Sequence, residues 1–284
     1  MEYDNLLNIL IKNALQEDIG PGDYSTRSSI GKEARGKAVL KIKQQGILAG
    51  VNVAERIFKY MQPEIRFVSF KRDGDPMEPG QLAFEVYADV HTILMCERLV
   101  LNCMQRMSGI ATLTQQYVKQ MQGCHAKLLD TRKTTPNFRL LEKEAVRIGG
   151  GFNHRFGLYD MIMLKDNHID YCGGITPAIQ KANAFLKENQ LSLPIEVETR
   201  SLDDVREVLR VGKVSRIMLD NFNPAEIAKA VLLIAGRYET EASGGITLDN
   251  IREYAQTGVD FISSGAIIHQ AKSLDLSLKA VIEK

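Results

Sequence analysis

The sequence has little cysteine and none of the cysteine or histidine spacings that are typical of metal sites. Its cysteines form no CxxC pair and have no companion histidines at ligand spacing; they are Cys96, Cys103, Cys124 and Cys172. A helix would place Cys96, Leu99, Cys103 and Met107 on one face. We therefore expect reduced, structural cysteines with buried thiols, and neither disulfides nor catalytic thiols.

Long apolar runs, a strong net charge and low-complexity tails are also absent. No apolar run approaches membrane-spanning length, and the opening MEYDNLLNILIKNALQEDIG is acidic and amphipathic, unlike a signal or transit peptide. The formal net charge is only +1, and no basic stripe is interleaved with aromatic residues. These absences argue against a nucleic-acid or membrane partner and predict a soluble, cytoplasmic protein.

The chain is long enough to bury a substantial core, in one large domain or two modest ones, with 284 residues of which 44% are hydrophobic and 25% charged. The first 110 or so residues contain three strand-like pieces, GKAVLKIK, IRFVSF and LAFEVYADV. Residues 91–121 then read as a helix with a break at Ser108–Gly109. Arg98, Asn102 and Gln105 form a polar stripe on that helix, which indicates an interface or a site, the alternative being an ordinary solvent-facing surface.

Beyond Lys127, short apolar runs alternate with helical or glycine-rich segments, as in the parallel strands of a barrel or doubly wound sheet. The runs are AKLLDT, YDMIMLKD, LPIEVET, VSRIMLDN, YETEASGG and DFISSGA. Six runs rather than eight favour an incomplete barrel. Each run ends in reactive or polar residues, where a βα-barrel builds its active site: Arg132 and Lys133, Lys165, Glu198, Asp220, Ser243, and Ser264.

The last two strand ends, EASGGI and ISSGAI, are typical of phosphate-binding loops because small residues leave backbone N–H groups open. The residues concerned are Ser243, Gly244, Gly245, Ser264, Gly265 and Ala266.

A concentration of positive charge lies in the long connection between Arg132 and Tyr159. Between Lys127 and Lys165 there are eight Lys and Arg residues against four acidic ones, with His154 in addition. GGGFNHRFG places His154 and Arg155 among glycines that let a ligand approach the backbone. A connection this long is usually functional. We therefore predict that two or more anionic groups bind here, the alternative being cations that merely coat a surface.

The sequence resembles the quinolinate phosphoribosyltransferase family over nearly its whole length. The resemblance is carried by EDIGPGDYST, ERLVLNCMQRMSGIAT, LLDTRKTTPNFR, EKEAVRIGGGFNHRFGLYDMIMLKDNH, IEVET, IMLDNF, EASGGI and SLDLSLK, in this order. It implies an α/β fold of type II phosphoribosyltransferase architecture: an N-terminal open α/β sandwich domain over residues 1–110, on which residues 271–284 pack back, and an incomplete, about six-stranded α/β barrel over residues 111–270.

The resemblance also implies an activity and its site. Quinolinate and phosphoribosyl pyrophosphate would give nicotinate mononucleotide, pyrophosphate and carbon dioxide, with Mg²⁺ and no organic cofactor. Arg132, His154, Arg155 and Lys165 are expected to hold the dicarboxylate, with Thr131 beside them. Lys133 is expected to meet the diphosphate or the second carboxylate.

The same resemblance assigns the acids and the assembly. Glu198 and Asp220 are expected at the ribose or at magnesium, directly or through water, and ordinary polar strand ends are the alternative. The expected assembly is a homodimer, or a higher oligomer, in which Arg98 completes the partner's site.

Three positions depart from the usual family pattern, Asn137, Glu144 and Ile268. Three rival functions are a paralogue associated with molybdenum genes, a Schiff-base aldolase or decarboxylase that uses Lys165 or Lys133 as nucleophile, and a non-catalytic sensor of phosphate ligands. TRKTTP and GGGFNHR favour the quinolinate enzyme over the first of these.

Overall fold

The computed structural model describes residues 3–281, which form two compact units. The first contains the chain up to Gln115, the segment Thr134–Gly150 and the chain from Ile268 onward. The second contains Gln116–Lys133 and Gly151–Ile267. Within residues 3–281, no helix has both the length and the apolar character needed to span a bilayer.

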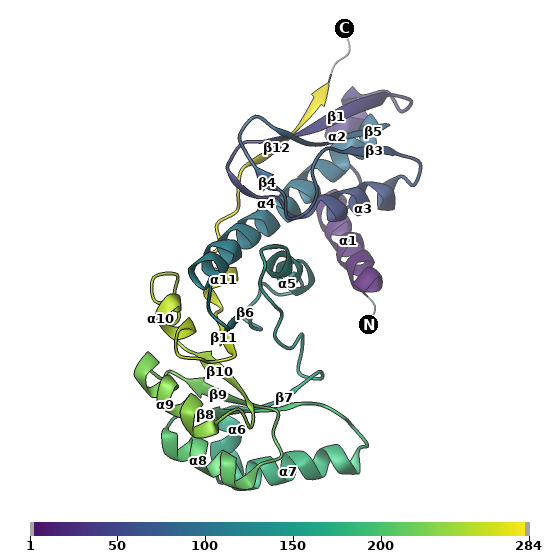
Figure 1. Ribbon diagram of the computed structural model, residues 1–284. Coiled ribbons are helices and arrows are strands. Elements are labelled where there is room, and N and C mark those ends of the chain that lie inside the picture. The colour runs from purple at the N-terminus through teal and green to yellow at the C-terminus, as the bar shows by residue number, and fades with distance from the viewer. Residues whose placement is uncertain (1–2, 282–284) are drawn as a thin grey trace. The chain divides into compact units, whose positions relative to one another are not determined.

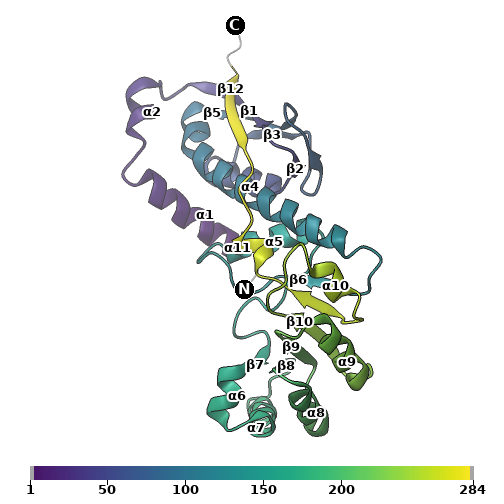
Figure 2. The same ribbon diagram turned by 90° about the vertical axis from the view of Figure 1, so that its left-hand side faces the viewer.

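The first unit is built on a four-stranded antiparallel sheet with the strand order β12-β1-β5-β3 (Figures 1 and 2). The strands are β1 (Arg35–Ile42), β3 (Arg66–Ser69), β5 (Leu82–Asp89) and β12 (Leu276–Val281). A separate two-stranded sheet pairs β2 (Gly46–Ile47) with β4 (Pro76–Met77). The predicted strand-like pieces correspond to β1, β3 and β5, and β12 brings the last described residues beside β1.

The first three helices of this unit are α1 (Tyr3–Ile19), α2 (Tyr24–Ser29) and α3 (Val51–Met61). α3 packs an aromatic side chain against the sheet, and α1 contacts α3. Phe58 of α3 meets the rings of Phe67 and Phe84 from β3 and β5 at centroid distances of 6.5 and 6.4 Å. α3 begins after a glycine that offers no side-chain cap, and Asp73 accepts the backbone N–H groups of Val51 and Asn52 instead.

α4 (Val90–Gln120) is one continuous helix of 31 residues. Cys96, Cys103 and Met107 have no exposed surface, which confirms the predicted buried thiols on this face. Burial raises the pKa of both Cys96 and Cys103 to about 12, so neither is a thiolate near neutral pH. Cys124 and Cys172 are half-buried, and all four cysteines are free.

The predicted helix break at Ser108–Gly109 is wrong, because both residues serve packing. The Ser108 hydroxyl accepts the backbone N–H of Ala49 at 3.0 Å. A Cβ atom at Gly109 would lie 2.1 Å from the carbonyl oxygen of Lys272. Glycine is therefore required here by the close approach of the returning chain, and the α-helical hydrogen bonds continue past it.

Within the long basic connection, α5 (Arg139–Ile148) belongs to the first unit. Its buried Glu142 accepts the Arg106 Nη2 at 2.8 Å and also the backbone N–H of Thr135. Arg106 further donates to the carbonyl oxygens of Ile268 and Ala271. These bonds connect α5 with α4 and with the last part of the chain. The predicted domain boundaries instead place residues 111–270, which include α5, in one domain, and those boundaries stay a prediction.

The second unit is an open sheet of six parallel strands in the order β6-β11-β10-β9-β8-β7. The strands are β6 (Lys127–Leu129), β7 (Ile162–Leu164), β8 (Ile195–Thr199), β9 (Arg216–Asp220), β10 (Glu239–Ser243) and β11 (Phe261–Ser263). Each falls within one of the six predicted runs, so the α/β fold with an incomplete, six-stranded barrel is confirmed.

Helices follow the strands of the second unit in the βα pattern that parallel pairing requires. They are α6 (Asp166–Cys172), α7 (Ile175–Glu188), α8 (Leu202–Val211), α9 (Pro224–Ile234), α10 (Ile251–Ala255) and α11 (Ala266–His269). α7 packs on β7 and α8 on β8, and both helices lie on the same side of the sheet in the two views (Figures 1 and 2). The opposite face of the sheet, which we call its inner side, carries the charged side chains described below.

We expect Gly109→Ala to destabilise the protein. Alanine is the better helix former by about 1 kcal/mol, so a glycine that only weakened the helix would give stabilisation. The contact with Lys272 predicts the reverse, a loss of about 1–3 kcal/mol from overpacking. Gly31→Ala is the control, because a Cβ atom there meets nothing within 4 Å. Urea and thermal unfolding of both variants would show which effect dominates, and a more stable Gly109→Ala protein would contradict the packing role.

Candidate active site

The inner side of the six-stranded sheet carries charged side chains at every second residue of three neighbouring strands. β8 presents Glu196 and Glu198, and β10 presents Glu239 and Glu241. Arg216 of β9 pairs in register with Glu196 on one side and with Glu239 on the other. Because side chains alternate along a strand, these residues share the face that also bears Asp220 and Ser243.

A cavity of about 310 Å³ opens among the strand ends and is strongly basic. Seven residues predicted for the site line it: Thr131, Arg132, Lys133, His154, Arg155, Lys165 and Ser243. Met163, Met218, Glu241 and Ser263 complete the lining. The long basic connection and the ends of β6, β7 and β10 therefore meet at one place, as expected for the carboxyl edge of a parallel sheet.

Two buried or half-buried carboxylates hold the segment that contains His154 and Arg155. Asp130, which has no exposed surface, accepts the backbone N–H of His154 at 2.8 Å and the Asn153 amide at 2.6 Å. Asp160 accepts the backbone N–H groups of Phe156 and Gly157 at 2.6 and 2.9 Å. The basic side chains thus extend from a backbone that is fixed on both sides of them.

Arg132 and Arg155 lie close enough to disfavour each other's charge. Burial and then the positive charge of Arg132 lower the pKa of Arg155. A guanidinium stays charged at any ordinary pH, so the lowered pKa reflects a charge that burial and then Arg132 make less favourable, and not a neutral side chain. Such like charges, half-buried around one cavity, indicate a site for an anion.

Glu198 and Asp220 form an acidic pair at the ends of β8 and β9. Burial and then the charge of Asp220 raise the pKa of Glu198, whereas Lys165 opposes the shift from 3.6 Å. Burial likewise raises the pKa of Asp220, against hydrogen bonds from Ser243 and Asn221. Neither acid lines the cavity, but each interacts with a residue that does, Glu198 with Lys165 and Asp220 with Ser243.

The glycine-rich turn after β10, predicted to leave backbone N–H groups open, has a left-handed backbone at both glycines. Gly244 has φ +95°, and a Cβ atom there would lie 2.2 Å from the Asn221 Oδ1. Gly245 also has a positive φ and faces open space. In the turn after β11, Ser264 is buried, its N–H donates to Leu129 and its hydroxyl donates to Ile246. Gly265 and Ala266 follow it directly.

The remaining predicted residue, Arg98, is exposed on α4, beside the exposed Asn102.

Of the three departures from the family pattern, Asn137 has φ +62°, the left-handed conformation that asparagine tolerates. The Glu144 carboxylate accepts a hydrogen bond from the Tyr3 hydroxyl. Ile268 is buried in the first unit.

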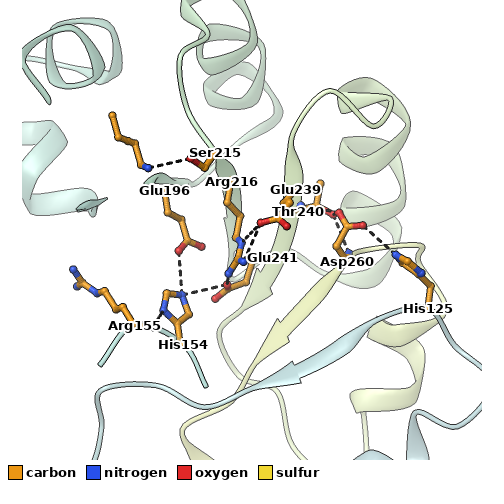
Figure 3. Close-up of polar contacts among 11 residues, drawn as sticks. His125, His154, Arg155, Glu196, Ser215, Arg216, Glu239, Thr240, Glu241 and Asp260 are labelled. Atoms are coloured by element: carbon orange, nitrogen blue, oxygen red, sulfur yellow. Dashed lines mark hydrogen bonds and ion pairs between the residues drawn. The ribbon is translucent and has the colours of Figure 1, made fainter. Parts of the chain in front are cut away.

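Sequence reasoning predicted His154 but missed its buried partners Glu196, Arg216 and Glu241. We call these four residues the His154 cluster (Figure 3); His154 and Glu241 also line the cavity. The His154 Nε2 lies 3.0 Å from the Glu196 Oε2 and 3.3 Å from the Glu241 Oε2. Arg216 Nη1 donates to the second of these carboxylates at 2.8 Å. The available signal was a second glutamate inside each of two short strands, Glu196 in IEVET and Glu241 in ETEAS.

The chain is similar over almost its full length to proteins that have been named for one reaction. It is 44% identical to "Nicotinate-nucleotide pyrophosphorylase [carboxylating], chloroplastic" of Oryza sativa subsp. japonica, covering 98% of this chain and 78% of that protein. It is 40% identical to "Probable nicotinate-nucleotide pyrophosphorylase [carboxylating]" of Bacillus subtilis, covering 97% and 94%.

Solved structures agree in fold. NadC from Streptococcus pyogenes superposes with a TM-score of 0.88 at 42% identity, covering 96% of each chain. The nicotinate-nucleotide pyrophosphorylase of Francisella tularensis superposes with a TM-score of 0.89 at 37% identity, covering 99% of this chain and 98% of that one.

Two family models match consecutive parts of the sequence. The N-terminal domain of quinolinate phosphoribosyl transferase matches residues 23–108, and its C-terminal domain matches residues 110–279. Together with the basic cavity at the strand ends and the acidic pair beside it, these matches mean that the chain belongs to the quinolinate phosphoribosyltransferase family.

Proposed function

We propose that this protein transfers the phosphoribosyl group of phosphoribosyl pyrophosphate to quinolinate with decarboxylation, in the biosynthesis of NAD. The products are nicotinate mononucleotide, pyrophosphate and carbon dioxide. One observation supports this above the others: five basic side chains, Arg132, Lys133, His154, Arg155 and Lys165, line a single cavity of about 310 Å³, with two carboxylates beside it. The family membership agrees with this activity.

The basic side chains suit a planar dicarboxylate. Quinolinate carries two adjacent carboxylates, and a guanidinium can bind each of them through two parallel hydrogen bonds. We assign to these carboxylates the basic residues Arg132, Arg155, His154 and Lys165. Thr131 lines the same cavity beside them. Binding relieves the repulsion between Arg132 and Arg155, because a negative charge then lies between two positive ones.

The acidic pair suits the transition state of phosphoribosyl transfer. Positive charge develops on the ribose ring as pyrophosphate leaves, and fixed carboxylates stabilise that charge more than they stabilise the ground state. Glu198 and Asp220 are the acids in position for this role. Lys133, which is exposed at the cavity, meets the diphosphate or the second carboxylate of quinolinate.

The same two acids fit a magnesium ion. Mg²⁺ prefers carboxylate oxygens and retained water. Burial and then the charge of Asp220 raise the pKa of Glu198, and a divalent cation would favour the charged form of both acids. They would hold it directly or through water. When bound, the metal helps to neutralise the charge of the leaving pyrophosphate.

Decarboxylation needs no organic cofactor in this scheme. Once the ring nitrogen is bonded to ribose it is a cationic pyridinium. It stabilises the carbanion that forms when the adjacent carboxylate leaves as carbon dioxide. The protein's part is to keep the ring and its carboxylates oriented while the charge changes.

The 5′-phosphate is assigned to the glycine-rich turns after β10 and β11. Backbone N–H groups near Ser243, Gly244 and Gly245 are accessible to it because the glycines carry no side chain. Because Ser264 already donates within the unit, Gly265 and Ala266 are the better candidates in the second turn.

The assembly we propose is a homodimer or a higher oligomer in which Arg98 of the partner subunit completes each site. Arg98 is exposed on a helix face that also bears Asn102 and Gln105, so a partner can reach it. The predicted location is the cytoplasm; of the plant relatives, those of Oryza sativa and Arabidopsis thaliana are named chloroplastic.

The activity is tested by incubating the protein with quinolinate, phosphoribosyl pyrophosphate and Mg²⁺ and measuring carbon dioxide and nicotinate mononucleotide together. We expect equal amounts of both. Product from nicotinate or nicotinamide but none from quinolinate would reject the substrate. Binding of phosphoribosyl pyrophosphate without release of pyrophosphate would indicate a sensor instead of an enzyme.

We expect Asp220→Asn to lower kcat by about 100-fold or more while the KM for quinolinate changes little. The amide keeps the shape of the side chain and removes its charge, so the loss falls on the cationic transition state. Steady-state kinetics with both substrates varied would separate the two effects. Asp203→Asn is the control, since Asp203 is 88% exposed on α8. An unchanged kcat with a large rise in KM would contradict the role of Asp220.

Subunit mixing tests the contribution of Arg98. We expect Arg98→Ala and Lys133→Ala homodimers each to be nearly inactive, since losing one charged partner at a desolvated dicarboxylate is costly. In a mixed dimer one site receives both substitutions and the other receives neither. Refolding the two variants in equal amounts should make about half of the dimers mixed by random pairing, which restores roughly a quarter of wild-type activity.

The mixed dimers must be confirmed by native mass spectrometry before their activity is interpreted. Recovery no greater than that of the separate variants, with mixed dimers present, would mean that Arg98 does not act across the interface. Glu97→Ala, paired with Lys133→Ala, is the matched control because Glu97 precedes Arg98 on the same helix.

A further inference from the structure

The His154 cluster places two glutamates at a cavity lined by five basic side chains, and one of the two, Glu241, lines that cavity itself. Glu196 and Glu241 have no exposed surface, and their side chains and that of His154 point toward one another from different strands and loops (Figure 3). A buried carboxylate is costly unless a cation pairs with it. A carboxylate at an anion site is unfavourable in a second way, because it repels the ligand. Both costs require an explanation.

The balance of charges within the cluster explains how these buried carboxylates can be tolerated. Arg216 pairs with Glu241 at 2.8 Å, which leaves the charge of Glu196 to be offset. If His154 is an imidazolium, two cations balance two carboxylates and the cluster is neutral. If His154 is uncharged and both glutamates are ionised, a net negative charge lies buried at the cavity. A proton on Glu196 would also balance the cluster, because burial and then the charge of Glu241 raise the pKa of Glu196 to about 7. A divalent metal beside uncharged His154 would instead leave an excess positive charge with Arg216 in place.

The two ring nitrogens of His154 have different contacts. Nδ1 accepts the backbone N–H of Arg155 at 2.6 Å, so in this contact Nδ1 is unprotonated. Nε2 lies 3.0 and 3.3 Å from the carboxylates of Glu196 and Glu241, and a positive ring is attracted to both. The imidazolium therefore requires the Arg155 contact to open, because a protonated Nδ1 cannot accept an N–H group.

We propose that Glu196, Glu241 and Arg216 are positioning residues that hold His154 as an imidazolium at the cavity, where it adds a positive charge to the site. The proposal rests on the proposed function only for the identity of the ligand, quinolinate. The two glutamates fix Nε2, so the charge is presented in one orientation. Arg216 offsets the Glu241 carboxylate, so that with His154 charged the cluster is neutral rather than negative beside the ligand.

The electrostatic surroundings of His154 come from several elements. Asp130 bonds its backbone N–H, Glu196 and Glu241 face its ring from β8 and β10, and Arg216 stands behind Glu241 from β9. The remaining charged groups at the cavity are Arg132, Lys133, Arg155 and Lys165.

Burial alone would lower the pKa of His154, but the hydrogen bonds to Glu196 and Glu241 outweigh it and raise the pKa to about 9. The imidazolium is therefore present below about pH 9 and is lost above it. An ordinary histidine loses its charge near pH 6.5. Between these two values, the charge on His154 depends on the glutamates.

The charge is measured directly from the ring ¹⁵N chemical shifts of the ligand-free protein. The chain has five histidines, and the spectrum of His154→Gln assigns the signal. We expect both ring nitrogens of His154 to be protonated at pH 7.5, and Glu241→Gln to lower the pKa by more than about one unit, because one of the two carboxylates is neutralised. Glu239→Gln is the matched control: Glu239 also binds Arg216 but is 54% exposed and makes no contact with His154.

The consequence for the ligand is measured by calorimetry with quinolinate. For Glu241→Gln we expect affinity about tenfold weaker than wild type at pH 8 and near-wild-type affinity at pH 6, where an ordinary histidine is charged. A purely structural role for Glu241 would weaken binding equally at both pH values. If Glu241→Gln does not fold, Glu196→Gln provides the same comparison.

Three results would overturn the inference: an uncharged His154 in the wild-type protein at pH 7.5, a loss of affinity in Glu241→Gln that does not depend on pH, or a divalent metal whose removal by a chelator changes the His154 signals. Failure of the proposed function looks different. In that case quinolinate does not bind to the wild-type protein, while the ring shifts still report the imidazolium and its dependence on Glu241.

Discussion

Buried carboxylates are what allow this protein to hold so many cations together. Asp130 and Asp160 accept backbone N–H groups on either side of His154 and Arg155, and Glu196 and Glu241 hold the ring of His154. Each acid interacts with neighbouring groups of the fold, and the basic side chains of the same segment remain at the cavity. In the first unit Glu142 does the same for Arg106 and Thr135. Removing one of these carboxylates would leave a buried cation or N–H group without its partner. Each of these acids is therefore important for the stability of the fold.

Much of the second unit could be predicted because two physical patterns agree in its sequence. Parallel strands buried on both faces read as short apolar runs, and the residue that follows each run lies at the carboxyl edge. The positions of Arg132, Lys165 and Ser243 at one cavity follow from that rule alone. The roles of Glu198 and Asp220 needed the family resemblance, since polar strand ends are common in any sheet.

What could not be predicted depends on contacts between distant parts of the chain. Gly109 reads as a helix breaker until Lys272 is placed against it, and no local pattern reveals that approach. Glu196 and Glu241 stand inside strand cores, where their charges can be explained only by His154 and Arg216. Asp130 and Glu142 were counted as acids that reduce the local positive charge. In the structure they fix the backbone that carries the positive charge, and a net count of charges cannot distinguish these two roles.

The site therefore combines two opposite electrostatic arrangements. Burial and then the charge of Arg132 lower the pKa of Arg155, and an anion stabilises these like charges. In the His154 cluster, of which His154 and Glu241 also line the cavity, opposite charges balance each other. A protein whose cations were all balanced by acids would bind an anion weakly, and one with no balancing acids would be less stable before the ligand arrives. Because the two arrangements involve different cations, the fold can stay intact without the ligand while Arg132 and Arg155 keep their attraction for a molecule with two carboxylates.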